Sequence, residues 1–491
     1  MASTRAKRHN NALKWTPQTR AFFAKRRKKS TRLLRHLAWR YATSNNTATI
    51  WSGDLCGNTL EIGNQLMNTR SLLLVALLSI FTVTTVLAEE PGDYNFPREC
   101  IATEAGYPVP LCGKPLTKTP VVVKQKGDKA LKKYPEHFIP EKEILADNEM
   151  RITVVGSGNP PLRRGQASTS LLVELGNGDN LIIDVGGGTV PALWSLRVPP
   201  ALLDKLFVTH LHLDHVGGIF GLWDSMGWAR NTPLHVWGAS GSMPDLGVAA
   251  FVENVQKAGA WHTLSKTGVI ASGGMKMVAH EFDGQQFTPE KPRALVYDEN
   301  GVKIYAFPVD HILIGAVGYR LEWNGLSMVY TGDSIPTKFE AEQAKGVDVF
   351  LHELFIDAPT FSEKNNMPLE VAESVADEHT SADMLGRVFS IAKPRLGVGT
   401  HFFINEYTVD PAFAEIASTY NGPVVIAQDL MVINVTPEQI VTRMAKTDLL
   451  SWAAPAPKTE GQKPPKLDPA PTEGRTQSWV TKTRFKNDEI E

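Results

Sequence analysis

Short blocks of apolar and β-branched side chains, separated by turn residues, run along the chain from about residue 150. Arg151–Val155, Ser170–Leu175 and Asn180–Asp184 have the length and composition typical of strands. The Asn177-Gly178 pair between the second and third blocks predicts a tight hairpin. Further strands are predicted at Lys303–Val309, Gly318–Trp323, Ser327–Thr331, Val347–His352 and Arg395–Thr400.

Helical patterns follow these strands. Pro368–Glu378 and Ser381–Ala392 are predicted as helices, and the hydroxyls of Thr380 and Ser381 are candidate caps for the second one. Asp383 falls in its first turn, where a negative charge is favourable. Strands followed by mixed strands and helices indicate an α/β protein in which sheets pack between helices.

The segments that flank this region have a different composition. Residues 89–149 are rich in Pro, Lys and Glu and are interpreted as an N-terminal extension wrapped on a domain of residues 150–445. Residues 446–491 carry six prolines between positions 455 and 471 together with many charges, which is typical of a loose tail.

The start of the chain resembles a targeting segment. Arg70 precedes an apolar run from Leu72 to Leu87, and the small residues before Glu89 predict a signal peptide over residues 67–88. The run of 16 residues is shorter than the roughly 20 that a membrane helix needs, so no stable membrane anchor is expected after cleavage. A signal anchor or a buried helix is the alternative interpretation of this run. We therefore expect a periplasmic or secreted protein.

Residues 1–66 do not fit at the front of a signal peptide. Residues 1–50 hold 13 basic and no acidic side chains. One hypothesis is that translation starts at Met67 and that residues 1–66 are not made. A long basic leader or a nucleic-acid-binding arm are the alternatives, ranked lower because such an arm would precede an export signal.

Cleavage after Ala88 changes the electrostatics of the protein. It removes 14 of the 51 basic and two of the 52 acidic side chains, which leaves 37 against 50 and a net charge of −13. An acidic surface repels polyanions, so no nucleic-acid partner is expected. Cys100 and Cys112 would remain, and in an exported chain they are candidates for a disulfide.

The stretch His210-Leu211-His212-Leu213-Asp214-His215 carries most of the chemistry. Four metal-capable side chains fall within six residues, directly after the apolar run Leu206–Thr209. Neutral imidazoles and carboxylates are ligands for zinc and related divalent ions. Because so short a stretch cannot close one tetrahedral site without strain, it is interpreted as parts of two adjacent sites in a two-metal hydrolase.

The remaining ligands must come from farther along the chain. His311, Asp333 and His401 each follow a predicted strand, where side chains from several strands can converge. A carboxylate has two oxygens and can bridge two ions, and Asp333 is the candidate for that role.

This set of motifs resembles the metallo-β-lactamase superfamily over roughly residues 150–440. Within it the chain is most similar to the ribonuclease Z-like branch, which also includes exported alkyl- and arylsulfatase-type enzymes. The matching segments are His311 with Gly318-Tyr319-Arg320 after it, Thr331-Gly332-Asp333, His352-Glu353, His379-Thr380-Ser381 and Thr400-His401. Ribonuclease Z proteins carry a tRNA-gripping arm, but here only 21 residues, filled by predicted strands, separate His311 from Asp333.

The resemblance implies a four-layer αβ/βα sandwich that binds two Zn²⁺ ions per chain, with Mn²⁺ or Fe left open. It implies His379 as the group near the leaving oxygen and Glu353 as the carboxylate that orients it. Asp214 is expected to bind one metal and to guide a proton of the hydroxide. The implied ligands are His210, His212, His311 and Asp333 at one site, and Asp214, His215, His401 and Asp333 at the other.

The expected activity is cleavage of a small sulfate or phosphate ester by a metal-bridging hydroxide. A lactone or amide hydrolase, a ribonuclease Z-like endonuclease and a non-enzymatic zinc-binding protein are the alternatives. Homodimerisation is left open, as is the organic group of the substrate. Candidates for the wall of an apolar pocket, each also explained by ordinary core packing, are Trp223, Trp228, Trp261, Phe402 and Tyr407.

Overall fold

The structure is a computed structural model in which eight stretches of the chain are described. All of them belong to one compact unit, residues 88–491. The predicted leader, the signal peptide and both cysteines of the mature chain lie outside the described residues. Within the described part, no helix combines the length and the apolar character that crossing a membrane requires. The described residues are 122–124, 131–227, 230–271, 273–405, 407–448, 450–455, 467–469 and 476–484.

Two mixed sheets form the centre of the fold. The larger sheet has nine strands in the order β1-β16-β15-β2-β3-β4-β5-β6-β7, and parallel pairing begins at β4 and continues to β7. Its strands are β1 (Val122–Lys124), β2 (Met150–Gly156), β3 (Ser170–Leu175), β4 (Asn180–Ile183), β5 (Lys205–Phe207), β6 (Leu234–Ala239), β7 (Met277–Phe282), β15 (Met431–Val435) and β16 (Gln439–Met444).

The smaller sheet has seven strands in the order β14-β13-β12-β11-β10-β9-β8. Strands β11 to β14 pair in parallel, while β8, β9, β10 and β11 form an antiparallel meander. Its strands are β8 (Ala294–Glu299), β9 (Val302–Pro308), β10 (Val317–Trp323), β11 (Leu326–Tyr330), β12 (Val349–Glu353), β13 (Leu396–Thr400) and β14 (Val424–Ile426).

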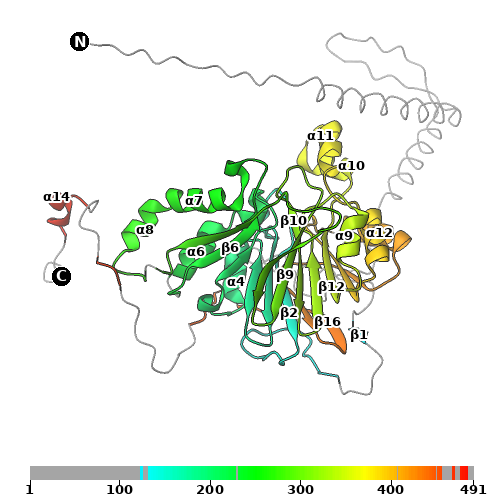
Figure 1. The fold of residues 1–491 in the computed structure, drawn as a ribbon, viewed down its shortest axis with the longest axis horizontal. Helices are drawn as coiled ribbons and strands as arrows, with labels where there is room; N and C mark the ends of the chain where they lie inside the picture. The colour runs from blue at the N-terminus through cyan, green and yellow to red at the C-terminus, as the bar shows by residue number, and fades with distance from the viewer. Residues whose placement is uncertain are drawn as a thin grey trace, which may run out of the picture. The chain divides into compact units, whose positions relative to one another are not determined.

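Helices cover the outer face of each sheet. Helices α4, α6 and α7 lie on one side of the strands and α9 and α12 on the other (Figure 1). The α-helices in the described residues are α4 (Thr189–Ser195), α5 (Leu213–Val216), α6 (Ile219–Gly227), α7 (Val248–Ala258), α8 (Ala260–Lys266), α9 (Lys338–Gln343), α10 (Ala358–Asn365), α11 (Leu369–Ala376), α12 (Ala382–Ala392), α13 (Val409–Thr419) and α14 (Ser478–Thr481).

The apolar core has three parts that correspond to these layers. Side chains alternate across a strand, so Leu171 and Val173 of β3 face the other sheet while Leu172 faces the helices. The central part lies between the two sheets, and the other two lie between each sheet and its helices. This is the four-layer αβ/βα sandwich expected from the sequence.

The described part of the N-terminal extension packs on the larger sheet. The backbone of Phe138 bonds to Met444 and Lys446 at the end of β16. Glu149 is fully buried and accepts hydrogen bonds from Lys132, Tyr134 and Asn434. Burial of a carboxylate is costly unless it is hydrogen-bonded, and these three donors satisfy it.

The strands and the two helices expected from the pattern are all present, and their ends differ from the expected ones by at most two residues. The expected capping of α12 was wrong. Ser381 occupies the N-cap position, but its hydroxyl donates to Asp383 instead of accepting from the helix backbone. The hydroxyl of Thr380 donates to the carbonyl of Ser334, which ties the start of α12 to the loop after β11.

Candidate metal centre

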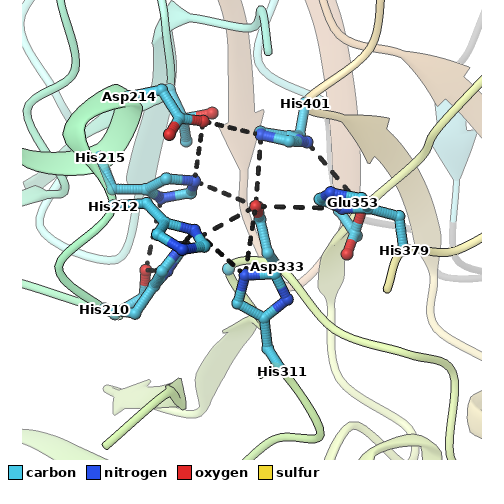
Figure 2. Close-up of polar contacts among 12 residues, drawn as sticks. His210, His212, Asp214, His215, His311, Asp333, Glu353, His379 and His401 are labelled. Atoms are coloured by element: carbon cyan, nitrogen blue, oxygen red, sulfur yellow. Dashed lines mark hydrogen bonds and ion pairs between the residues drawn. The ribbon is translucent and has the colours of Figure 1, made fainter. Parts of the chain in front are cut away.

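The predicted ligands converge where strands of both sheets end. The carboxyl ends of β4 and β5 lie together because these strands are parallel, and the same holds for β11, β12 and β13. His210 and His212 follow β5, Asp333 follows β11 and His401 follows β13. Figure 2 shows that the seven side chains point toward one another, with the carboxylate of Asp333 at the centre.

Three imidazoles and Asp333 form the first cluster. Nδ1 of His212 lies 3.0 Å from Nε2 of His210 and 3.2 Å from Nε2 of His311. Oδ2 of Asp333 lies 3.9 Å from Nε2 of both His210 and His311. His212 is exposed, whereas the other three residues are buried.

Two imidazoles and two carboxylates form the second cluster. Nε2 of His215 lies 3.1 Å from Oδ1 of Asp333 and 3.5 Å from Oδ2 of Asp214. Nε2 of His401 lies 3.0 Å from Oδ2 of Asp214 and 3.4 Å from Oδ2 of Asp333. Asp333 therefore belongs to both clusters, as expected for a bridging carboxylate.

Both clusters fit divalent metal ions. Donor atoms about 2.0–2.1 Å from one tetrahedral ion lie roughly 3.4 Å apart, and the distances here run from 3.0 to 3.9 Å. Nε2 of His215 and Oδ1 of Asp333 are shielded from solvent and make no hydrogen bond of acceptable geometry. These two atoms lie 3.1 Å from each other, and a buried imidazole nitrogen and carboxylate oxygen that face each other without a well-formed hydrogen bond fit a shared ion.

Burial and mutual charge set the protonation of the clusters. Burial and the neighbouring His215 ring hold the pKa of His210 well below its usual value. Burial opposes the charge of Asp214, yet His215 and His401 lower its pKa to about 2. His401 and His215 likewise hold the pKa of Asp333 well below its usual range despite its burial. The two carboxylates thus stay ionised, which is the form that binds a metal ion.

Asp184 orients His215, and it was not among the predicted site residues. Its Oδ2 accepts a hydrogen bond from Nδ1 of His215 at 2.8 Å, and both oxygens accept from the backbone and hydroxyl of Thr209. Asp184 is fully buried and has a left-handed backbone with φ of 56°. A metal-ligating histidine commonly donates its other ring nitrogen to such a carboxylate, which fixes the tautomer. The available signal was a carboxylate at the last position of the predicted strand Asn180–Asp184.

His379 and Glu353 lie next to the second cluster. Nδ1 of His379 lies 2.8 Å from Oε2 of Glu353, and its ring stacks on Phe355 at 4.4 Å. Nδ1 of His379 is 4.0 Å from Oδ2 of Asp333. Burial would lower the pKa of His379, but Glu353 and Asp333 raise it to about 9. Glu353, His379 and His401 could also surround an ion, but Nδ1 of His379 is already paired with Glu353.

A buried polar network holds Glu353 and the loop after β11. Oε1 of Glu353 accepts from the backbone of Ser334, and the Ser334 hydroxyl donates to Glu340. Nε2 of His352 lies 3.2 Å from the same Glu340, so this histidine faces away from the clusters. The structure places His352 behind the site, as a support for Glu353.

A second network holds the loop that carries His401. The amide of Gln166 donates to the carbonyl of Phe402 and accepts from the backbone of Ile404. The amide of Gln166 also donates to the hydroxyl of Ser157, and Asp429 accepts from the backbone and hydroxyl of Ser157. Asp429 thereby holds Gln166 in place through Ser157. His401 itself has φ of 57°, a conformation that needs such support.

Two cavities open onto the clusters. The first, of about 270 Å³, lies against His210, His212 and His311 and extends to the end of β6 and the start of α7. The second, of about 460 Å³, lies against His212, Asp214, Asp333, His379 and His401 and is bordered by α11. Of the five aromatic residues considered for a pocket wall, Trp228 lies outside the described residues, and the other four line neither cavity. Phe402 and Tyr407 line a separate cavity of about 90 Å³.

Comparison with known proteins agrees with this arrangement. In sequence the chain is similar to the ribonuclease Z-like branch of the metallo-β-lactamase superfamily, a class of metal-dependent hydrolases that act on ester bonds. A family model described as the anti-Pycsar protein Apyc1 matches residues 150–362.

Several ribonuclease Z proteins are similar in sequence. That of Mycobacterium marinum is 28% identical over 260 residues, which cover 51% of this chain and 84% of the relative. That of Mycobacterium bovis is 26% identical over 307 residues, or 59% of this chain and all of the relative. Among solved structures, YhfI from Bacillus subtilis has 19% identity and a TM-score of 0.42, covering 58% of this chain and 100% of that one. The short form of human tRNase Z has 18% identity and a TM-score of 0.44, with 58% and 99% covered.

Proposed function

We propose that this hydrolase cleaves a small phosphate or sulfate ester with two zinc ions bound at the two clusters. The observation that carries the proposal is that the two clusters share Asp333 and that a paired imidazole, His379, lies at the rim of the second one. Both kinds of ester have oxyanions that can contact two ions at once.

The ligand atoms divide between two ions. His210, His212, His311 and Asp333 would hold one, and Asp214, His215, His401 and Asp333 the other. When bound, the ions would supply a water molecule of lowered pKa and positive charge beside the attacked atom. A ligand set made only of imidazoles and carboxylates suits zinc, and manganese or iron also accept such ligands.

The protein's own side chains then manage the protons. The water oxygen bonds to phosphorus or sulfur while the bond to the leaving oxygen breaks, and the proton that the water loses passes to solvent. Asp214 borders the second cavity and is placed to orient that water. His379 is placed to give its proton to the leaving oxygen, and Glu353 keeps the ring oriented and charged. The products are an alcohol or phenol and the remaining phosphate or sulfate.

A ribonuclease Z-like endonuclease is the second candidate, because the similar sequences carry that name. Two observations count against a tRNA substrate. The segment between His311 and Asp333 is occupied by β10 and β11, and the described residues that line the two cavities include no lysine or arginine. Binding of a polyanion depends on such cations.

We also propose that the protein acts after export, on the strength of the charge and apolar pattern of residues 67–88. N-terminal sequencing of the native protein should then give Glu89 as the first residue. A mature form that starts near Ala2 would contradict both the export signal and a start at Met67.

The test of function is a substrate panel with the zinc-loaded mature protein. It contains an aryl sulfate, a bis-aryl phosphate, a lactone, a β-lactam and a precursor tRNA. We expect turnover of an oxyanion ester that a chelator abolishes. Turnover confined to the lactone or β-lactam would support a carbonyl hydrolase instead, and turnover confined to precursor tRNA would support the endonuclease.

A further inference from the structure

The two cavities lie on either side of one partition. His212 and Ile312 line both of them, so these two side chains separate the space against the first cluster from the space against the second. An ester group held at the clusters therefore has room for one substituent in each direction.

Both cavities are apolar away from the clusters. The walls of the first are formed by Leu246, Val248 and the 312–316 turn, and those of the second by Pro160, Leu213, Val371 and Val375. The charged side chains among the described lining residues, apart from the clusters and His379, are Asp245 in the first cavity and Glu378 in the second. Carboxylates disfavour a substituent that carries its own negative charge.

The partition is held by a strained turn. Ile312 has φ of 44°, a left-handed conformation that is an outlier for a β-branched residue. The backbone N–H of Leu313 donates to the carbonyl of His311 at 2.6 Å, which closes the turn around Ile312. Ile312, Leu313 and Ile314 are 50–61% exposed, although they are aliphatic. Strain of this kind persists where a fixed geometry serves function, and exposed aliphatic side chains in a row indicate a binding surface.

We propose that the substrate is a phosphate diester with two uncharged, apolar organic groups, one in each cavity, and that Ile312 and Leu246 determine this specificity. This inference rests on the proposed function and narrows its substrate class. A sulfate monoester has one organic group and would leave one cavity empty, whereas a diester fills both. An engineered aliphatic cavity of about 150 Å³ accommodates benzene, so each cavity has space for an aryl or short alkyl group.

The position of His379 indicates which cavity holds the leaving group of the diester and which holds the retained group. His379 lines the second cavity, so the leaving group lies there and the group that is retained lies in the first cavity. Water attacks phosphorus, the bond to the leaving oxygen breaks, and His379 protonates that oxygen. The products are an alcohol or phenol and a phosphate monoester that carries the retained group.

The experiment compares phenyl and methyl as the retained group, with p-nitrophenol as the leaving group in both diesters. The zinc-loaded protein should prefer the phenyl ester in kcat/KM by about 10- to 100-fold over the ratio measured with a small zinc complex in solution. The Leu246→Asn variant, which makes the wall of the first cavity polar, should bring this ratio to within about twofold of the small complex. Leu264→Asn is the matched control, because Leu264 is half-exposed on α8 and lines neither cavity.

Binding gives a second readout that does not require turnover. Calorimetry should show tighter binding of diphenyl phosphate than of dimethyl phosphate to the wild-type protein and to Leu264→Asn, with the difference lost in Leu246→Asn. Equal kcat/KM ratios for the wild-type protein and the small complex, or equal ratios for the two variants, would overturn the specificity proposal while leaving the proposed function intact. No turnover of either diester, together with no binding of either phosphate, would overturn both.

Discussion

Asp184→Asn is the substitution that most sharply separates a role in metal binding from a role in folding. The carboxylate of Asp184 accepts three hydrogen bonds at 2.8 Å, two from Thr209 and one from Nδ1 of His215. Asparagine has the same shape and tolerates the left-handed backbone at this position, so the substitution changes hydrogen bonding and charge and little else.

The expected losses of stability and metal affinity follow from the groups that donate hydrogen bonds to Asp184. An amide has one acceptor oxygen, so its NH₂ group must face either the backbone N–H of Thr209 or Nδ1 of His215. In the first case a buried donor is left without an acceptor, which costs about 1–3 kcal/mol of stability. In the second case His215 must change tautomer and would direct a proton at the metal position. Loss of such a supporting partner lowers metal affinity by about 10- to 100-fold, or about 1.4–2.8 kcal/mol.

The assay is a zinc competition titration with a chromophoric chelator, together with urea unfolding of the metal-free protein. Asp348→Asn is the matched control, because Asp348 is also buried and accepts from the backbone N–H of one residue, Ser327, and from Arg395. We expect both variants to lose stability and only Asp184→Asn to lose zinc affinity. Unchanged zinc affinity in Asp184→Asn, with a loss of stability like that of Asp348→Asn, would refute the reasoning.

Three further predictions concern the leaving group, the backbone and the pH dependence of stability. His379→Ala should lower kcat by about 10²- to 10⁴-fold without loss of bound zinc, with the larger effect for phenol than for p-nitrophenol as leaving group; equal effects would argue against a general acid. Gly332→Ala should lower the unfolding free energy by roughly 1–3 kcal/mol more than Gly346→Ala does. Both glycines have φ near +65°, but only the new Cβ at position 332 would meet Thr209, at 2.7 Å. Equal losses in the two variants would show that this contact relaxes freely. Burial raises the pKa of Asp429 to about 6, so the folded state binds more protons than the unfolded state between about pH 4 and 6. The stability of the wild-type protein relative to Asp429→Asn should therefore fall by up to about 3 kcal/mol as pH rises through that window in urea titrations, and a rise would mean that Ser157, Ala167 and Arg163 keep the carboxylate ionised.

The strands that carry the site residues could be predicted because most of their side chains are buried. Strands β11 and β13 are buried along most of their length, so they appear in the sequence as largely apolar runs, and they end shortly before Asp333 and His401. The convergence of His311, Asp333 and His401 followed from their positions after such strands. Their metal-binding role remains a prediction, which the grouping of the side chains supports.

Other strands were not predicted because their sequences lack a clear apolar pattern. The buried polar residues Asn434 and Arg443 interrupt β15 and β16, since they pair with Glu149 and Glu143 of the N-terminal extension. β7 and β8 are edge strands with half-exposed side chains, and their composition is mixed.

The residues that form the cavity walls could not be predicted from the sequence either. Aromatic residues were the candidates, but Trp223 is buried in the core, and Phe402 and Tyr407 line only a separate cavity away from the clusters. The actual walls are aliphatic and come from segments that are far apart in the sequence, such as Pro160, Leu213 and Val371. Asp184 was missed for a related reason, because its partner His215 lies 31 residues away.

The central claim is that ester hydrolysis depends on metal held by the two clusters through Asp333. The most direct measurement is turnover of a bis-aryl phosphate by the chelator-treated protein as zinc is added back, alongside metal content per chain, for the wild-type protein and for Asp333→Asn. We predict that wild-type activity returns with two zinc ions per chain and that Asp333→Asn recovers neither the second ion nor the activity. Turnover that survives removal of the metal, or an Asp333→Asn variant that binds two ions and remains fully active, would contradict the account.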